Sequence, residues 1–319
     1  AFEPSWLGDQ LVVLYLPFLL ASLVESWTVF RRVNRWMTIE LILTLWAFFI
    51  LFLTQSRISF LTVLFFGAVV FFIVGYKIIV KIFWRSEREL KVTNFQRAFL
   101  SVLMLVLLVS LLIGGVTAVG RVLSNLDPRL DNLFSAPRRV SEFAYFHPNE
   151  AIFEAADQLA FSERLVYWAV GFSTFAKHPI LGVGPGGTGF FFEENVPAYG
   201  YELTEIQNVI REQDFGFPNP KNLWIRLLSE SGILGFSFYL IWYTLLAALS
   251  VLLIRLPRSF NRVVGMAGLL ILGAQLVEGF SIDTYALPHF WIAVGLLTAC
   301  GIQARTFNIH SRMLPKGAG

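Results

Sequence analysis

An arginine between two long apolar stretches is the first residue of this chain whose type and place point to chemistry. Arg57 ends the polar sequence Thr54-Gln55-Ser56-Arg57. A charged side chain beside membrane hydrocarbon is costly unless it is paired or functional. One interpretation is that the guanidinium only extends to the lipid headgroups. The other is that it binds phosphate, for which its planar fork of donors is well suited.

A second group of charges follows two prolines near position 220. The sequence Asn219-Pro220-Lys221-Asn222 is followed by an expected helix from about Leu223 to Ser231. Within that helix Arg226 and Glu230 are four residues apart, so they can pair on one face. The segment is therefore either an interfacial helix with a surface ion pair or a site that combines two cations with a carboxylate.

A glycine-rich run lies between these two groups, Gly182-Val183-Gly184-Pro185-Gly186-Gly187-Thr188-Gly189. A dinucleotide-binding fingerprint needs a strand before the glycines and a helix after them, and the sequence indicates neither. We expect a tight chain reversal that packs against other backbone. The alternative is that its backbone amides donate to a lipid phosphate.

Metal and cofactor chemistry is not indicated. The chain has four histidines and one cysteine, Cys300, with no His-x-x-x-His and no cysteine pair. A zinc site is therefore improbable. Asp127 and Asp131 lie four residues apart and are interpreted as a solvated loop face. We predict no metal, no cofactor and no nucleic-acid partner.

The elements that must position these residues are membrane helices. Only 15% of the residues are charged and 56% are apolar, whereas soluble domains carry about 25% charged residues. Continuous apolar runs indicate helices and not a barrel. The predicted spans are Leu11–Phe30, Met37–Leu53, Ile58–Tyr76, Phe99–Val119, Ile233–Ile254, Val263–Val277 and His289–Ile302.

The charges of the connections predict the orientation. Lysine and arginine concentrate in Arg31–Trp36, Lys77–Arg97, Arg255–Arg262 and the tail from Arg305, whereas the long connection Arg121–Asn222 holds more acids than bases. Basic connections stay in the cytoplasm. Seven spans then place the long connection outside the cytoplasm, in a multi-pass protein in contact with membrane lipids.

The long connection is expected to be folded, because aromatic residues occur throughout it and disordered segments lack them. Ser162 and the apolar spacing from Arg164 to Ala176 predict a helix that ends at Lys177-His178-Pro179. Phe190–Asn222 is expected to be irregular. The predicted fold is an all-α polytopic bundle with a membrane block (1–120), an extracytoplasmic loop domain (121–222) and a second membrane block (223–319).

Together, four motifs in this order resemble the O-antigen ligase and polymerase superfamily of bacterial membrane proteins. They are the opening Phe2-Glu3-Pro4-Ser5-Trp6-Leu7-Gly8, the segment ending at Arg57, Arg164-x-x-x-Trp168 leading into His178-Pro179-Ile180-Leu181-Gly182, and Asn222-Leu223-Trp224 through Glu230 to Gly235. The resemblance implies transfer of a glycan from undecaprenyl diphosphate to an acceptor hydroxyl on a glycan or lipid, without metal or nucleotide.

The resemblance also implies roles for single residues. Arg57, Arg164, Lys221 and Arg226 would hold the diphosphate, since fixed cations make it a good leaving group. Glu3, Glu230 and His178 are candidates for the base on the acceptor. Trp168 and Asn222 would contribute to substrate binding in an aromatic, acidic loop.

One position departs from the family pattern. Many ligases have His-Asn where this chain has Lys221-Asn222. A lysine with a pKa of about 10.4 stays protonated at neutral pH and can hold diphosphate, but it cannot accept a proton. A polymerase is therefore the leading prediction. The alternatives are a ligase, a protein O-glycosylating enzyme and, from another class, a transporter of the lipid-linked glycan.

Overall fold

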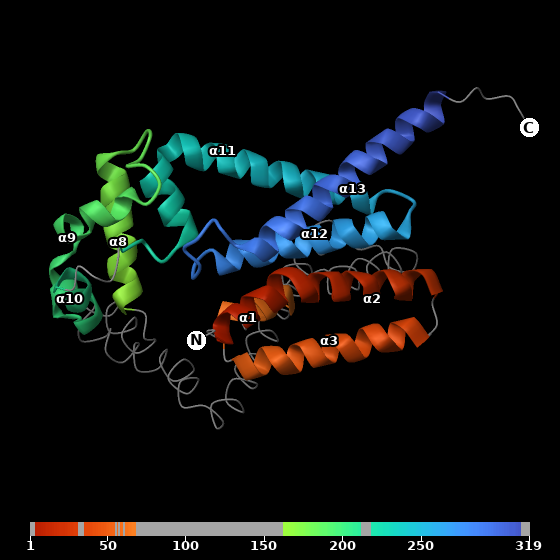
Figure 1. Cartoon of the computed structure of the whole chain (residues 1–319), viewed down its shortest axis with the longest axis horizontal. Coiled ribbons are helices and arrows are strands. Elements are labelled where there is room, and N and C mark those ends of the chain that lie inside the picture. Colours follow the sequence, from red (N-terminus) through yellow and green to blue (C-terminus); the bar gives the residue numbers. More distant parts are fainter. Residues whose placement is uncertain are drawn as a thin grey trace, which may run out of the picture. The chain divides into compact units, whose positions relative to one another are not determined.

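The structure, a computed structural model, describes residues 4–30, 35–54, 56, 58–59, 61–67, 162–211 and 218–313. The predicted span Phe99–Val119, most of Ile58–Tyr76, and the aspartates Asp127 and Asp131 lie outside these residues. Regular secondary structure in the described residues is entirely helical (Figure 1). The chain forms two compact units. One comprises Ala1–Leu64, Tyr167–Ala198 and Gln207–Gly319, and the other comprises Phe65–Val166 and Tyr199–Ile206.

The N-terminal part is a nearly continuous apolar helix followed by an antiparallel partner. It consists of α1 (Pro4–Gln10), a π-helical turn η1 (Leu11–Tyr15) and α2 (Leu16–Phe30), and α3 (Arg35–Thr54) packs against it. Pro17 lacks the N–H that would bond one turn back, and the turn before it is the wider π-helical one. The prediction that this span begins at Leu11 is wrong, because the apolar helix already begins at Trp6.

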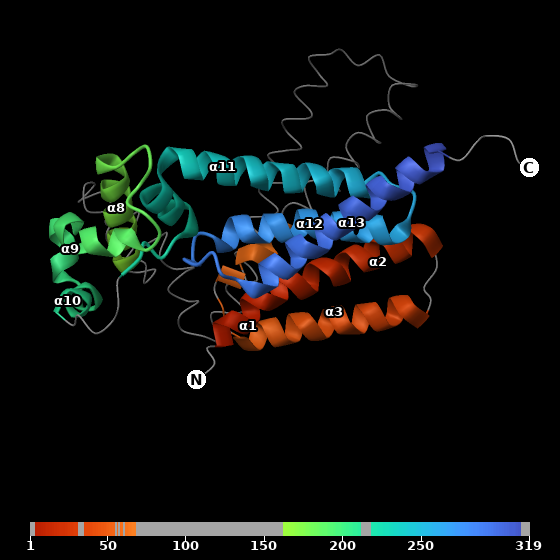
Figure 2. The ribbon, with the colours of Figure 1, turned by 45° about the horizontal axis from the view of Figure 1, so that its top comes forward.

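The C-terminal part contributes three long helices, α11 (Leu223–Ile254), α12 (Ser259–Glu278) and α13 (Pro288–Met313). Helix α12 packs against α2, η1, α11 and α13 and is therefore central to the bundle (Figure 2). Small residues permit the close approach of α11, since a Cβ at Gly265 would lie 2.6 Å from the Ser250 carbonyl oxygen. Such small-residue contacts are typical of helices that pack in lipid.

Three described helices are long and apolar enough to cross a membrane: Trp6–Trp27, Leu223–Ile254 and Ser259–Glu278. The last is longer than the predicted Val263–Val277. Helices α3 and α13 cover the predicted spans Met37–Leu53 and His289–Ile302. The count of seven spans stays a prediction, as does the extracytoplasmic side of the long connection.

Buried polar pairs join helices that are distant in sequence. Glu25, the acid within the first predicted span, accepts hydrogen bonds of 3.0 and 3.1 Å from Arg262 Nε. At the opposite end of α12, Glu278 Oε1 accepts a 2.9 Å bond from Thr62. Nearby in the sequence, Ser59 donates to Asp9 of α1 over 3.2 Å. The Glu25–Arg262 and Thr62–Glu278 pairs fix the position of α12 against the N-terminal part of the chain.

The described part of the long connection is folded, as predicted. Helix α8 (Ser162–Lys177) has the expected bounds. It is followed by a 3₁₀ turn η2 (Gly187–Phe191), α9 (Phe192–Asn195), a 3₁₀ turn η3 (Ala198–Glu202) and α10 (Thr204–Arg211). The prediction of an irregular segment from Phe190 onwards is therefore wrong in part. Glu205 in the first turn of α10 and Arg211 in its last turn complement the helix dipole.

Candidate functional site

The site is built around a break in helix α11. Gly232 has φ 63° and ψ −170°, which no helical residue adopts, so the helix ends its first section at Ser231 and resumes at Ile233. Two helical hydrogen bonds are lost there. They are the bonds that the N–H groups of Ile233 and Leu234 would make to the carbonyls of Ser229 and Glu230.

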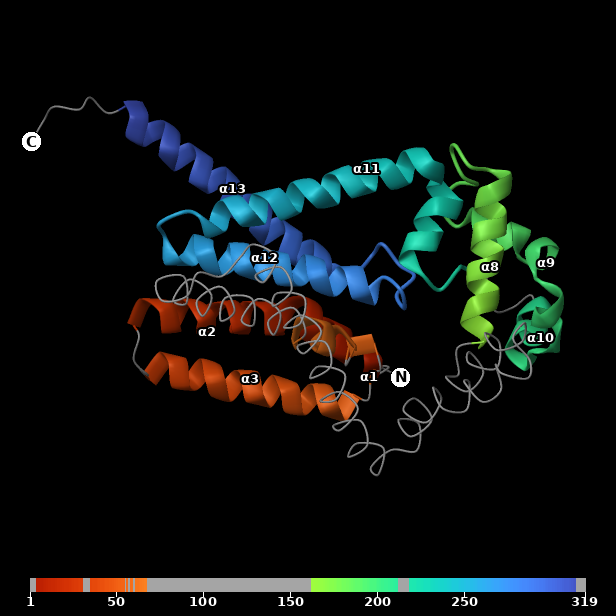
Figure 3. The same ribbon diagram turned by 180° about the vertical axis from the view of Figure 1, so that it is seen from behind.

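The chain after α8 replaces both lost bonds with four new ones. Val183 N and Gly184 N donate to the carbonyls of Ser229 and Glu230 over 3.0 and 2.8 Å. In return, Ile233 N and Leu234 N donate to Pro179 and Ile180 over 2.9 and 3.3 Å. The four backbone groups of α11 that the break frees, the carbonyls of Ser229 and Glu230 and the N–H groups of Ile233 and Leu234, are thus all paired, as burial requires. The two segments lie together at the bend of α11 (Figure 3).

Glycine is needed on both sides of this contact. A Cβ at Gly232 would overlap the carbonyl oxygen of Ile180, and a Cβ at Gly182 would overlap the backbone of Glu230. Both residues also have positive φ, 63° and 67°. The expected chain reversal packed against other backbone is thus confirmed. The amides of Val183 and Gly184 are occupied by protein carbonyls, so they do not serve a phosphate in this arrangement.

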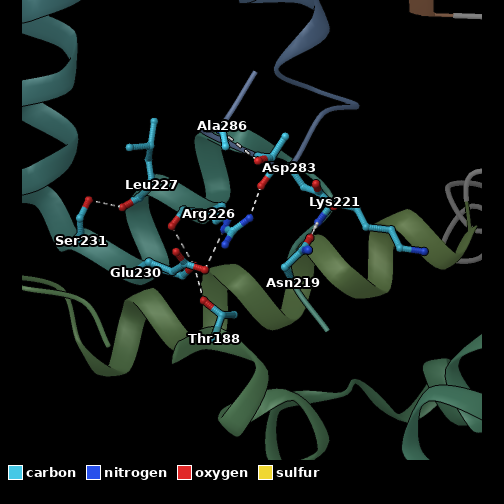
Figure 4. Close-up of polar contacts among 11 residues, drawn as sticks. Thr188, Asn219, Lys221, Arg226, Leu227, Glu230, Ser231, Asp283 and Ala286 are labelled. Carbon is cyan, nitrogen blue, oxygen red and sulfur yellow. Dashed lines mark hydrogen bonds and ion pairs between the residues drawn. The ribbon is translucent and has the colours of Figure 1, made fainter. Parts of the chain in front are cut away.

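Arg226 is held from three directions within the first section of α11 (Figure 4). Its Nε donates to Glu230 Oε1 over 2.8 Å, which confirms the predicted pair at four-residue spacing. Its Nη1 donates to the carbonyl of Asp283, and its Cζ lies 5.2 Å from the ring centroid of Tyr285. Within the described part of the chain, Nη2 has no hydrogen-bond partner, so two donors of the fork remain for a ligand.

The Glu230 side chain is buried beside Arg226. Only 2% of the residue is exposed, and Oε2 has no hydrogen-bond partner among the described residues. Its neighbour Ser229 is tied to the glycine-rich run, since its hydroxyl lies 2.8 Å from that of Thr188. The carboxylate therefore orients the guanidinium and does not open to solvent here.

The connection between α12 and α13 completes this arrangement, although sequence analysis assigns it no role. The carbonyl of Tyr285 accepts a 2.7 Å bond from Trp291 Nε1, and the hydroxyl of Thr284 accepts from Ala286 N over 3.1 Å. Burial raises the pKa of the Tyr285 phenol, with a further contribution from Glu230. The phenol thus stays neutral beside Arg226. A tyrosine in a short connection between two predicted spans is the signal that could have pointed to it.

Lys221 lies directly before α11 in a strained conformation. Its φ of 46° is positive, which is uncommon for a residue with a side chain. The Asn219 side chain stabilises the turn by accepting from Lys221 N over 2.9 Å. The ammonium lies 4.2 Å from the centroid of the buried Tyr167 ring, and the side chain extends away from Arg226 (Figure 4). The two cations therefore do not converge in this arrangement.

Asn222 is the N-cap of α11. Its amide oxygen accepts from the backbone of Trp224 and Ile225 over 2.9 and 3.2 Å, and the residue is 1% exposed. Such a cap typically contributes about 1 kcal/mol. The start of α11 is also fixed to the end of α12, because Leu223 N donates to the Gly279 carbonyl over 2.8 Å. Lys221 and Arg226 are thereby placed on a rigid support.

The remaining predicted site residues are not brought to this cluster by the described contacts. His178 is exposed just after α8, and its ring centroid lies 5.2 Å from that of Phe191. The ring centroids of Trp168 and Phe280 are 6.3 Å apart. Arg164 belongs to the second compact unit. Arg57 and Glu3 lie outside the described residues.

In the part of the chain that the structure describes, no group of three or more histidine, cysteine, aspartate or glutamate residues could hold a metal ion. What the cluster offers is the restrained guanidinium of Arg226, whereas Lys221 extends away from it. Such an arrangement suits an anionic ligand.

The sequence matches one protein family. A family model described as O-antigen ligase matches residues 42–240, which is more than half of the chain. The match includes the glycine-rich run, Lys221, Arg226, Glu230 and the break at Gly232. Among curated proteins, none matches the chain.

Proposed function

The chain belongs to the O-antigen ligase family, and we propose from that premise that it transfers a glycan from a lipid-diphosphate carrier to an acceptor hydroxyl. As a member of this superfamily it is a multi-pass membrane protein of the ligase and polymerase type. The finer assignment is to a polymerase that uses an undecaprenyl-diphosphate-linked donor in polysaccharide assembly.

The observation that carries the proposal is the restrained guanidinium of Arg226. Three groups among the described residues fix its orientation, and none of those residues bonds to Nη2, whose donors we propose bind a ligand. A planar guanidinium binds phosphate oxygens with defined geometry. Held in place before the reaction, it stabilises the charge that develops on the leaving diphosphate without reorganisation.

The reaction is a substitution at the anomeric carbon of the donor sugar. The acceptor oxygen forms a bond to that carbon, and the bond from the carbon to the diphosphate oxygen breaks. The diphosphate leaves with the electron pair, and the hydroxyl proton passes to a base. Arg226 and Lys221 are proposed to face the diphosphate, together with Arg57 and Arg164. Glu3 and His178 remain the proposed bases.

We assign Glu230 a positioning role in place of the role as base that the sequence indicated. Its carboxylate is closed to solvent and bonded to Arg226. A base must reach the proton that it removes. We therefore assign Glu230 to positioning Arg226. Asn222 likewise acts by capping α11 and so placing Lys221, and Trp168 remains a proposed contact for sugar.

The proposed site faces the extracytoplasmic side of a bacterial inner membrane. Arg255, Arg258 and Arg262 at the far end of α11 and the start of α12 favour the cytoplasm for that end. In a Cys300→Ala background, a cysteine at the exposed Glu194 should react with an impermeant thiol reagent when only the outer membrane is permeable. Labelling only after the inner membrane is opened would reverse the orientation.

The direct test is transfer by the purified chain in lipid nanodiscs. Undecaprenyl diphosphate carrying an oligosaccharide is mixed with an acceptor glycan, and both the extended glycan and the released undecaprenyl diphosphate are measured. Extension with equal release of the carrier, unaffected by a chelator, is expected. Movement of the intact donor across vesicles without release of the carrier would instead indicate a transporter.

A further inference from the structure

The chain reversal that follows α8 carries two large apolar side chains on its outside. Ile180 and Leu181 are 61% and 72% exposed, in a segment that four backbone hydrogen bonds join to α11. Two such side chains side by side are costly to leave in water, at about 25 cal/mol for each Å² of apolar surface. The rigid backbone prevents them from folding inwards.

These side chains lie next to an exposed apolar stripe on α11. Exposed apolar residues recur along α11 after the break at three- and four-residue spacing, and they are Leu234, Phe238, Ile241 and Leu245. This spacing places them on one face of the helix. The stripe begins at Leu234, whose N–H donates to the carbonyl of Ile180. Ile180 and Leu181 thus extend this exposed apolar surface beyond the end of the straight helix.

The length of the helix places this extension at the membrane boundary. From Ile233 to Ile254 an α-helix rises about 33 Å, close to the roughly 30 Å thickness of the hydrocarbon core. At the other end, Arg255 and Arg258 mark the opposite boundary. The break at Gly232 and the paired segment Pro179–Gly184 therefore fall where acyl chains meet headgroups.

We propose that the segment Pro179–Gly184 is an interfacial membrane anchor, with Ile180 and Leu181 inserted into the acyl-chain boundary of the bilayer. Apolar side chains at a fixed point commonly insert at this depth. The same segment holds the carbonyls of Ser229 and Glu230. The anchor therefore sets the depth of the Arg226 cluster relative to the lipid headgroups. It does not depend on which reaction the cluster performs.

The test measures the depth of single fluorophores. Cys300 is the only cysteine, so Cys300→Ala provides a background for Leu181→Cys, with Leu245→Cys as the mid-span control and Glu194→Cys as the exposed polar control. Each variant is labelled with an environment-sensitive dye and reconstituted in vesicles of phosphatidylethanolamine and phosphatidylglycerol. Nitroxide lipids quench either near the headgroup or near the chain end, and iodide quenches from water.

The dye at position 181 should be quenched several-fold more by the shallow nitroxide than by the deep one. The dye at position 245 should show the opposite order. The dye at position 194 should be quenched mainly by iodide. Quenching by iodide alone at position 181 would overturn the proposal, since the segment would then lie in water. Resistance to all three quenchers would overturn it too, because protein would cover the patch. Ile180→Cys provides a second position if Leu181→Cys does not fold.

Discussion

Gly184 N donates a 2.8 Å hydrogen bond to the carbonyl of Glu230, the residue whose carboxylate holds Arg226. Gly184 and Glu230 are 46 residues apart in the sequence. The bond between them joins the glycine-rich reversal to the charged turn of α11. The reversal supplies the hydrogen bonds that the broken helix lacks. The rigidity of the Arg226 cluster follows from this exchange.

Gly232→Ala should strongly destabilise the protein, because a Cβ there meets the carbonyl oxygen of Ile180 and the backbone has positive φ. Gly184→Ala is the matched control, since Gly184 also has positive φ (87°) but open space around its Cβ position. Strain alone costs about 1–2 kcal/mol. Thermal unfolding in detergent should therefore show a clearly larger loss for Gly232→Ala. Equal losses would mean that the close packing adds nothing.

Glu230→Gln should retain more transfer activity than Glu230→Ala. The amide oxygen of glutamine can still accept from Arg226 Nε, whereas alanine leaves the guanidinium without this partner. Loss of a charged hydrogen bond of about 1.5–3 kcal/mol corresponds to a loss of activity of about 10- to 100-fold in the alanine variant. Equal inactivity of both variants, with unchanged stability, would instead assign Glu230 as the base.

Tyr285→Phe should keep most of the activity, and Tyr285→Leu should lose several-fold. Phenylalanine preserves a ring face beside Arg226, and such a contact contributes about 0.5–2 kcal/mol. The raised pKa of Tyr285 keeps its phenol protonated through the neutral range, so its ionisation should add no step to the pH profile between pH 6 and about 9. Inactivity of the phenylalanine variant would show that the hydroxyl itself takes part.

Lys221 is predicted to act as a cation. Lys221→Arg should then retain more activity than Lys221→Met or Lys221→Gln, since a guanidinium keeps the charge and cannot release its proton. Lys177→Met, at an exposed lysine paired with Glu194 over 2.5 Å, is the control and should be active. Full activity of Lys221→Met would remove Lys221 from the diphosphate site.

Local features of the fold could be predicted where adjacent residues determine them. The helix that begins at Leu223, its interruption at Gly232 and the pairing of Arg226 with Glu230 all follow from spacing and glycine placement. Helix α10 was missed because its apolar positions are few and its eight residues lie among prolines. Short helices of this kind are stabilised by packing more than by propensity.

Features that depend on distant segments could not be predicted. The glycine-rich run indicated close backbone contact, but nothing in its sequence identified Ser229 and Glu230 as the partners. The contribution of Tyr285 and the Asp283 carbonyl depends on how the connection after α12 folds back over α11. Asn222 was predicted from the sequence to bind substrate, whereas its side chain caps helix α11 in the structure.

The most direct test of the central claim is the rate of glycan transfer by Arg226→Lys. Lysine keeps the charge but loses the fork, so transfer from the lipid-diphosphate donor should fall about 10- to 100-fold with thermal stability retained. Arg255→Lys, at an exposed arginine beyond the other end of α11, is the matched control and should transfer at the wild-type rate. Wild-type transfer by a stably folded Arg226→Lys would contradict the claim that Arg226 binds the diphosphate.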